Sequence, residues 1–221
     1  SIRLNPNHFK ALNNLANLYA EQGDVSDAVG VYIKVIEIEP NYAQAHNNLG
    51  NAFKEQGDLI KARESYNRAL EIDSGFAEAR YNMGIILKRN GRVEEAIDSY
   101  KKAIYLKPDY VQAYNNLGVL YKDNEKYEDA IKMFTKAKEI QPDHQNSYYN
   151  LALIKKEQGL NEEAVEYLLK LLDINPEHNE AKVLLKKYFR HDRKYMLLSI
   201  DKAIKINPKN ANNYHNRAVL L

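Results

Sequence analysis

The chain has 221 residues, of which 44% are hydrophobic and 28% are charged, which is the balance of an ordinary folded protein. Its 32 basic and 30 acidic residues give a net charge of +2, so bulk charge indicates neither a nucleic-acid-binding nor a membrane-surface protein. The absence of cysteine excludes disulfide bonds and thiolate chemistry, and no apolar run is long enough to cross a bilayer.

A period of 34 residues runs through the sequence. Proline marks it at Pro6, Pro40, Pro108, Pro142 and Pro176, with Ser74 at the one skipped place and Pro208 two residues early. Glycine follows the same period in two registers, Gly50, Gly84 and Gly118 in one and Gly23, Gly57, Gly91 and Gly159 in the other. Because independent residue types agree on one spacing, we expect a chain built from repeated supersecondary units.

In chain order, the period divides the sequence into units of about residues 7–40, 41–74, 75–108, 109–142 and 143–176, a divergent unit 177–208 and a partial unit 209–221. Each unit is expected to form two helices. In the second unit, Leu49 and Ala52 recur at helical spacing, and Gly57 then predicts a helix end because glycine adopts the left-handed conformation readily. A second helix follows, with Ala62 and Tyr66 on its buried face.

The unit junctions predict further local details. In three units the residue directly after the proline is suited to cap the next helix: Asn41, Asp109 and Asp143. Glu125 stands where other units have the turn glycine, and Asn124 beside it is the residue expected to tolerate the left-handed conformation.

These residues resemble the tetratricopeptide repeat family, whose units are helix pairs of 34 residues. The family's Leu-Gly pair is present as Leu49-Gly50 and Leu117-Gly118, and its alanine, aromatic, alanine and proline as Ala96, Tyr100, Ala103 and Pro108. The resemblance implies an all-α fold, a right-handed α–α superhelical solenoid that spans residues 1–221 as a single domain. It also implies that the first helix of each unit lines a concave groove and that Tyr32, Tyr66 and Tyr100 lie in the core.

Asparagine is concentrated at the positions that the resemblance assigns to this groove. The main series, next to the leucine, is Asn14, Asn48, Asn82, Asn116 and Asn150. It is flanked by Asn13, Asn47, Tyr81, Asn115 and Tyr149 and, one turn on, by Asn17 and Asn51. Since an asparagine amide both donates and accepts, this asparagine ladder is predicted to bind the main chain of an extended peptide. With helices roughly 8–10 Å apart and about 3.3 Å per extended residue, one asparagine meets about every third peptide residue.

Neighbours of the ladder are expected to select the peptide sequence, such as Lys54, Lys88, Lys122 and Lys156, together with Tyr81 and Tyr149. The ladder is similar to that in the superhelical arm of the nucleocytoplasmic O-linked N-acetylglucosamine transferases, where it holds substrate polypeptides. The alternative interpretation is that the asparagines are tolerated polar residues or form hydrogen bonds between helices, since asparagine is common at this place in the family.

Other classes of function are weighed against this one. Capture of chaperone C-termini needs lysine and arginine at positions that hold asparagine or tyrosine here. His8, His144 and His178 all stand two residues after the repeat proline, so they indicate a repeat position and no converging catalytic or metal site. Residues 186–195 mix cations with aromatics, but they coincide with the irregular unit and favour a solvated turn over nucleic-acid binding.

We therefore expect a non-catalytic protein–protein interaction scaffold that binds an extended polypeptide segment, with no cofactor, no metal, no nucleic acid and no membrane insertion. The alternatives are a structural subunit that uses its convex face and open ends, or the substrate-recognition arm of a larger enzyme such as a glycosyltransferase. Self-association through the apolar C-terminal residues 218–221 is left open, and the expected location is cytoplasmic or nuclear.

Overall fold

The computed structural model describes residues 8–189 and, after them, residues 196, 197, 200, 201, 204, 205, 208, 209 and 214. Every regular element among these residues is helical. The helices are α1 (Phe9–Gln22), α2 (Val25–Ile38), α3 (Ala43–Glu55), α4 (Leu59–Ile72), α5 (Ala77–Arg89), α6 (Val93–Leu106), α7 (Val111–Asp123), α8 (Tyr127–Ile140), α9 (Gln145–Glu157), α10 (Asn161–Ile174) and α11 (Asn179–Phe189). The all-α helix-pair architecture expected from the period is confirmed.

The chain forms two compact units, residues 1–117 and residues 118–221, and each is described by itself. The first contains α1 to α6 and the start of α7, and the second contains the rest of α7 and α8 to α11. That residues 1–221 make one domain stays a prediction.

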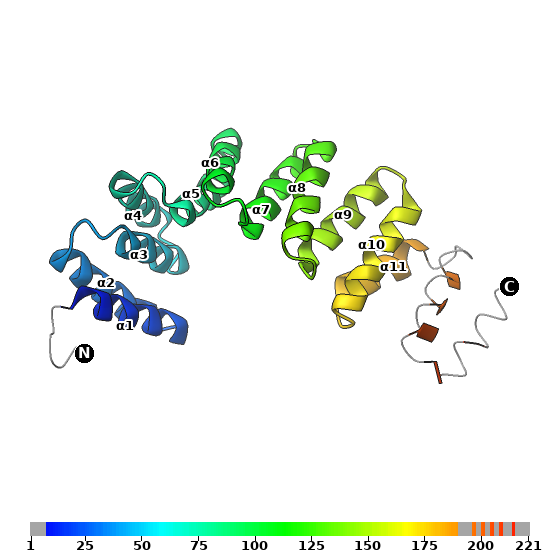
Figure 1. Ribbon diagram of the computed structural model, residues 1–221, viewed down its shortest axis with the longest axis horizontal. Helices are drawn as coiled ribbons and strands as arrows, with labels where there is room; N and C mark the ends of the chain where they lie inside the picture. Colours follow the sequence, from blue (N-terminus) through cyan, green and yellow to red (C-terminus); the bar gives the residue numbers. More distant parts are fainter. Residues whose placement is uncertain are drawn as a thin grey trace. The chain divides into compact units, whose positions relative to one another are not determined.

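The first unit is a stack of antiparallel helix pairs (Figure 1). Helix α1 packs on α2, α3 on α4 and α5 on α6, while α2 also contacts α3 and α4 contacts α5. The expected aromatic core is confirmed, because the side chains of Tyr32, Tyr66 and Tyr100 are buried. Tyr32 joins Ala16, Ala28, Leu49 and Ala52 in a cluster that connects one helix pair to the next.

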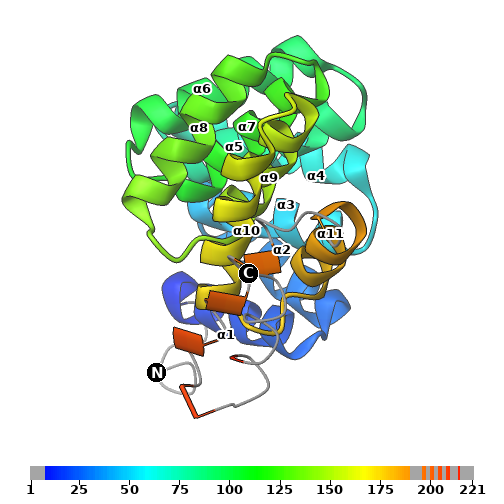
Figure 2. The same ribbon diagram turned by 90° about the vertical axis from the view of Figure 1, so that its right-hand side faces the viewer.

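The second unit repeats this arrangement with larger aliphatic side chains. Helix α8 contacts α9, α9 packs along α10 and α10 contacts α11, as both ribbon views show (Figure 1 and Figure 2). Leu168 and Leu171 stand where the family pattern has an aromatic and an alanine, and both are fully buried. They pack with Ala164, Ala181 and Leu184, so the divergent residues still fill the interior.

A residue with left-handed backbone follows each of the first helices α1, α3, α5, α7 and α9. Four of these residues are glycines with positive φ: Gly23 (86°), Gly57 (82°), Gly91 (71°) and Gly159 (74°). At the fourth turn along the chain Glu125 itself has φ of 58°, so the prediction that Asn124 takes this conformation is wrong. Asn124 instead donates from Nδ2 to the carbonyl oxygen of Leu120 at 2.7 Å, which satisfies one of the last carbonyls of α7.

Replacing Glu125 with glycine is expected to raise the free energy of unfolding by about 1 kcal/mol, since a side chain in the left-handed region costs roughly that much. Urea unfolding followed by circular dichroism measures the change. Glu128→Gly is the control, because Glu128 lies in the first turn of α8, where glycine is expected to lower stability. Equal effects of the two substitutions would contradict the assignment of strain to position 125.

The residues that precede the first helices differ from those predicted. Helices α3, α7 and α9 begin two residues after Asn41, Asp109 and Asp143, so these three are not the capping residues. The residue directly before α1, α3, α5 and α9 adopts non-helical backbone instead. Before α1 and α11 it is a histidine whose side chain caps the helix. Nδ1 of His8 accepts from the backbone N–H of Ala11 at 3.2 Å, and Nδ1 of His178 accepts from that of Ala181 at 3.3 Å. At the third histidine of this series, His144, Nδ1 lies 2.8 Å from the hydroxyl oxygen of Ser147 instead, and the side chain makes no capping bond to the backbone.

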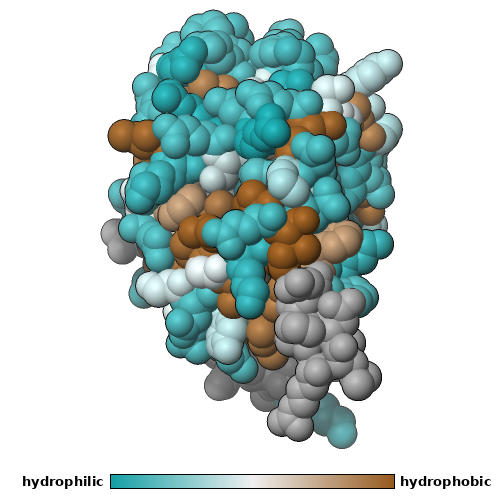
Figure 3. Space-filling model, turned by 90° about the vertical axis from the view of Figure 1, so that its left-hand side faces the viewer, coloured by the Kyte–Doolittle hydropathy of each residue, from teal (hydrophilic) through white to brown (hydrophobic). Residues whose placement is uncertain are grey.

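Apolar side chains gather on the end of the first unit that α1 and α2 form (Figure 3). Leu18 of α1 and Ile33 of α2 are both exposed there. One period later, the position of Leu18 is taken by Ala52 and then by Ile86, and both of these are buried. No helix among the described residues combines the length and the apolar character that crossing a membrane requires.

Candidate functional site

The predicted ladder residues lie on the first helix of each pair, but asparagines at the same repeat position differ in how exposed their side chains are. Asn14 is exposed, Asn48 and Asn116 are half-buried, and Asn82 and Asn150 are buried. Among the flanking residues, Asn13 and Asn47 are buried, and those that remain half-buried are Asn17, Asn51, Tyr81, Asn115 and Tyr149. The amides that a ligand can reach are therefore a subset of the predicted set.

In the first unit the amides form hydrogen bonds between successive first helices. Nδ2 of Asn48 on α3 donates to Oδ1 of Asn17 at 3.0 Å and to Oδ1 of Asn13 at 3.4 Å, both on α1. Nδ2 of Asn82 on α5 donates to Oδ1 of Asn47 on α3 at 3.0 Å, and this bond is buried. These bonds correspond to the alternative interpretation of helix-to-helix pairing, and they show that Asn47 and Asn82 are committed to the interior.

The corresponding hydrogen bond between α7 and α5 has a tyrosine as its acceptor. Nδ2 of Asn116 donates to the hydroxyl oxygen of Tyr81 at 3.0 Å. The ring of Tyr81 lies 5.7 Å from that of Tyr100 and 4.9 Å from that of Tyr110, measured between centroids. Burial raises the pKa of the Tyr81 hydroxyl, so it stays protonated in neutral solution. Both ends of this side chain are therefore used inside the unit.

Two further tyrosines hold half-buried asparagines by their oxygen atoms. The hydroxyl of Tyr32 donates to Oδ1 of Asn17 at 2.6 Å, and the hydroxyl of Tyr66 donates to Oδ1 of Asn51 at 2.9 Å. Burial, with the nearby Glu55 and Glu21 carboxylates, raises the pKa of Tyr32 to about 12, so the donor is retained. Within the described residues, Nδ2 of Asn17 and Nδ2 of Asn51 have no hydrogen-bond acceptor.

Lysines predicted to select the peptide sequence contact asparagines instead. Nζ of Lys54 lies 3.5 Å from Oδ1 of Asn51 and 3.5 Å from Oδ1 of Asn82, and burial lowers its pKa. In the second unit, Nζ of Lys122 donates to Oδ1 of Asn150 at 3.1 Å. These cations hold the amides in place, so they are less available to a ligand than the sequence suggested.

Tyr149, the predicted aromatic ladder residue of the second unit, also contacts a side chain of its own unit. The ring of Tyr149 stacks on that of His178 with 5.5 Å between centroids and an interplanar angle of 29°. Nearby, Nδ2 of Asn150 donates to the carbonyl oxygen of Asn146 at 2.9 Å within α9.

One ladder residue of the first unit is left incompletely bonded. Oδ1 of Asn115 is buried and has no hydrogen-bond partner among the described residues.

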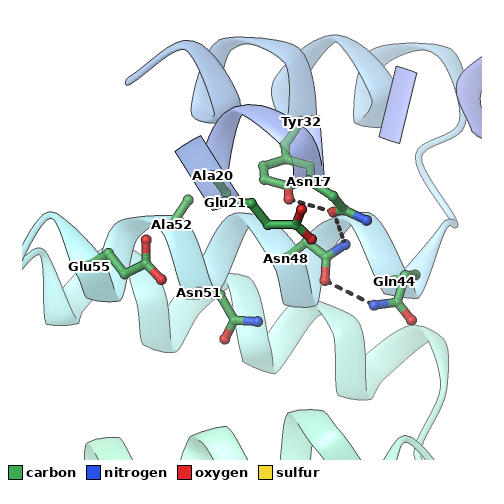
Figure 4. Close-up of a pocket in the computed structure, with 9 residues that line it drawn as sticks. All are labelled: Asn17, Ala20, Glu21, Tyr32, Gln44, Asn48, Asn51, Ala52 and Glu55. Atoms are coloured by element: carbon green, nitrogen blue, oxygen red, sulfur yellow. Dashed lines mark hydrogen bonds between the residues drawn. The ribbon is translucent and has the colours of Figure 1, made fainter. Parts of the chain in front are cut away.

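A cavity of about 280 Å³ opens between α1 and α3 in the first unit (Figure 4). Its lining consists of Asn17, Ala20 and Glu21 from α1, Tyr32 from α2, and Gln44, Asn48, Asn51, Ala52 and Glu55 from α3. Three of these belong to the predicted ladder. Glu21, Gln44 and Glu55 were missed, although Glu21 and Glu55 stand one period apart, seven residues after a ladder asparagine.

The remaining sequence-based sites fall partly or wholly outside the described residues. Lys186 and Lys187 are exposed at the end of α11, while most of residues 188–195 and the apolar residues 218–221 are not described. Among the described residues, no group of three or more His, Asp and Glu side chains is placed to hold a metal ion.

Family models match almost the whole of the described chain. A model of the TPR repeat matches residues 16–57, 50–91 and 86–125, and two models of the tetratricopeptide repeat match residues 109–177 and residues 1–30. The chain belongs to the tetratricopeptide repeat family. No curated protein sequence matches it.

Solved structures of other tetratricopeptide repeat proteins have the same fold. A crystal structure of MamA is 28% identical, with a TM-score of 0.66 over 75% of this chain and 96% of that one. YrrB, described as a TPR protein with an unusual peptide-binding site, is 23% identical, with a TM-score of 0.65 over 84% and 95%. PilF of Pseudomonas aeruginosa is 23% identical, with a TM-score of 0.76 over 95% and 96%.

Proposed function

We propose that this tetratricopeptide repeat protein is a non-catalytic scaffold that binds an extended polypeptide segment across the first helices of its units. The observation that carries the proposal is the state of Asn17 and Asn51, one period apart on α1 and α3. In each, a buried tyrosine fixes the amide oxygen, and the amide nitrogen has no acceptor within the described residues. Fixed donors of this kind suit the carbonyl oxygens of a peptide main chain.

The spacing of the two donors supports a peptide as ligand. Packed helices lie roughly 8–10 Å apart, and an extended chain advances about 3.3 Å per residue. Asn17 and Asn51 are therefore spaced to meet carbonyl groups about three residues apart. Asn14, which is exposed on α1, and Asn48, which is half-buried on α3, adjoin the same face. The fold is compatible with this use, since YrrB shares it and is described as having a peptide-binding site.

The buried members of the ladder are given a supporting role in this proposal. Asn13 accepts a hydrogen bond from the half-buried Asn48, while Asn47 and Asn82 join α3 to α5 through a buried bond of their own. The rest of the predicted set is given the same supporting role, because these side chains contact others within their own unit. They are Asn116, Asn150, Tyr81, Asn115 and Tyr149. Peptide contact is thereby assigned chiefly to Asn14, Asn17, Asn48 and Asn51.

Selection of random dodecapeptides displayed on phage, followed by fluorescence anisotropy of the enriched peptides, tests the proposal. The variant Asn17→Asp/Asn51→Asp keeps the oxygen that each tyrosine needs but removes both amide donors. We expect it to bind the selected peptides about tenfold or more weakly, because two hydrogen bonds are lost.

The matched control is Asn41→Asp/Asn67→Asp, which changes two exposed asparagines by the same charge. It should bind like the wild type, and circular dichroism should show that all three proteins are equally helical. Equal affinity of the two double variants, or no enriched peptide at all, would contradict peptide binding at Asn17 and Asn51.

A second candidate function is a structural subunit that contacts partners through its second helices. Ile60 on α4 is 67% exposed and Tyr105 on α6 is 86% exposed, so both side chains are accessible to a partner. If partner binding is insensitive to the Asn17 and Asn51 substitutions but is lost in Ile60→Ser/Tyr105→Ser, this second surface is the functional one.

A further inference from the structure

The cavity between α1 and α3 is lined by two carboxylates that have no role in the proposed binding of a peptide main chain. Glu21 lies in the last turn of α1, and Glu55 is the last residue of α3. Both side chains line the cavity; in Figure 4 Glu55 lies on the side away from Gln44, and the Glu21 carboxylate lies between Glu55 and Asn48. Two helices that belong to different repeats therefore each contribute one carboxylate to the same space.

Neither carboxylate forms an ion pair within the described residues, although the Glu55 carboxylate acts on the pKa of Lys54 in the same unit. In contrast, exposed carboxylates elsewhere, such as Glu71 and Glu95, pair with a neighbouring arginine. The influence of both carboxylates reaches the cavity wall, because together with burial they raise the pKa of the Tyr32 hydroxyl. No lysine or arginine lines the cavity, so its two carboxylates give its interior a negative potential.

The opposite side of the cavity offers neutral polar groups. Nε2 of Gln44 donates to Oδ1 of Asn48 at 2.9 Å, which holds the two amides together. Asn17 and Asn51 add the two amide nitrogens that have no acceptor in the described residues. The cavity therefore presents donors for a main-chain carbonyl beside acceptors for a cation.

We propose that this cavity binds a basic side chain, arginine in particular, of the polypeptide that lies across the first helices. The proposal rests on the peptide-binding function argued above and names the residue type that the site selects. The Asn17 and Asn51 amides hold the ligand's main chain, and the Glu21 and Glu55 carboxylates hold its guanidinium group.

Size and geometry favour arginine over other ligands. A cavity of 280 Å³ lies just below the range of about 300–1,000 Å³ for drug-sized ligands but holds far more than one water molecule of about 30 Å³. One long side chain suits it. A guanidinium has five N–H donors in a planar fork, so it can bridge carboxylates on two helices, which the compact ammonium of lysine does less well.

Two capped tripeptides of equal length test the inference, acetyl-Ala-Arg-Ala-amide and acetyl-Ala-citrulline-Ala-amide, which differ by one positive charge. Dissociation constants come from nitrogen-15 NMR titration, with the side-chain amide signals of Asn17 and Asn51 as reporters. We expect the arginine peptide to bind the wild type about fivefold more tightly at low salt, the magnitude of two exposed ion pairs. This preference should fall as salt is added.

The decisive variant is Glu21→Gln/Glu55→Gln, which should bind the two tripeptides equally. Its control is Glu37→Gln/Glu64→Gln, which removes two exposed carboxylates from the second helices α2 and α4 and should keep the preference for arginine. An unchanged preference in Glu21→Gln/Glu55→Gln, or equal binding of both tripeptides by the wild type, overturns the inference.

The outcome is separable from that of the proposed function. If the selected dodecapeptides depend on Asn17 and Asn51 while the arginine preference is absent, the main-chain site stands and the acidic pocket is wrong. If neither the dodecapeptides nor the tripeptides bind, both proposals are wrong.

Discussion

Replacing Gly50 with alanine is expected to lower the free energy of unfolding by about 1–3 kcal/mol, the usual cost of forcing extra volume into a packed interior. A Cβ atom at Gly50 would lie 2.6 Å from Cε1 and 2.7 Å from Cδ1 of Tyr66, and 3.1 Å from the carbonyl oxygen of Ala62. These separations are far inside van der Waals contact, so the helix pair α3–α4 would have to move apart.

The ring of Tyr66 cannot easily yield to the new methyl group. It is fully buried, and its hydroxyl is held by Oδ1 of Asn51 at 2.9 Å. Moving the ring would break this bond and disturb an amide that we assign to ligand binding. Gly50→Ala is therefore expected to weaken peptide binding as well as the fold.

Gly30 provides the matched control within the same unit. It lies in the middle of α2, has ordinary helical φ, and an added Cβ would meet nothing within 4 Å. Gly30→Ala should raise the free energy of unfolding by about 0.5–1 kcal/mol, because alanine favours the helix more than glycine does. Urea unfolding followed by circular dichroism measures both changes, and the same sign for the two substitutions would contradict the packing argument.

This contrast also shows what the sequence can predict. The period separates Gly50, Gly84 and Gly118 from Gly30, which belongs to no series, and so distinguishes close helix contact from chance. It likewise predicts the turn glycines, since a left-handed residue is needed once in each unit. The helix pairs follow from the spacing, and the buried aromatics follow from the family resemblance that the spacing reveals.

Spacing cannot predict which of two adjacent asparagines faces the interior. Asn13 and Asn14 are consecutive, and a helix turns by about 100° per residue, so one is buried and the other is exposed. Nor can spacing predict burial along one series, because Asn82 packs against α3 whereas Asn14 has no described helix before it. Glu21 and Glu55 each lie one helical turn after a ladder asparagine, Asn17 and Asn51, but spacing alone cannot predict that the stacking of α1 on α3 brings both carboxylates to one cavity.

Asn82→Ala is expected to lower the free energy of unfolding by about 1–3 kcal/mol, whereas Asn14→Ala, at the same repeat position, should change it by less than about 0.5 kcal/mol. Asn82 is buried and donates to Oδ1 of Asn47 at 3.0 Å. Its removal leaves that oxygen without its donor in the interior and deprives Lys54 of one acceptor. Asn14 is exposed, so water replaces whatever its amide binds.

A double-mutant cycle isolates the bond between α3 and α5. Asn47→Ala, Asn82→Ala and the combined variant should show a coupling energy of about 0.5–1.5 kcal/mol, since the second substitution removes a group that the first has already left unpaired. Additive effects would mean that the 3.0 Å bond contributes nothing to stability.

The same cycle separates the two roles open to a ladder asparagine. If Asn82→Ala destabilises the protein but leaves the affinity for the selected dodecapeptides unchanged in the folded fraction, Asn82 acts only between helices. If it abolishes peptide binding with no loss of stability, Asn82 contacts the peptide directly, and the site extends inward beyond Asn17 and Asn51. Because its amide nitrogen is already bonded to Asn47, we expect the first result.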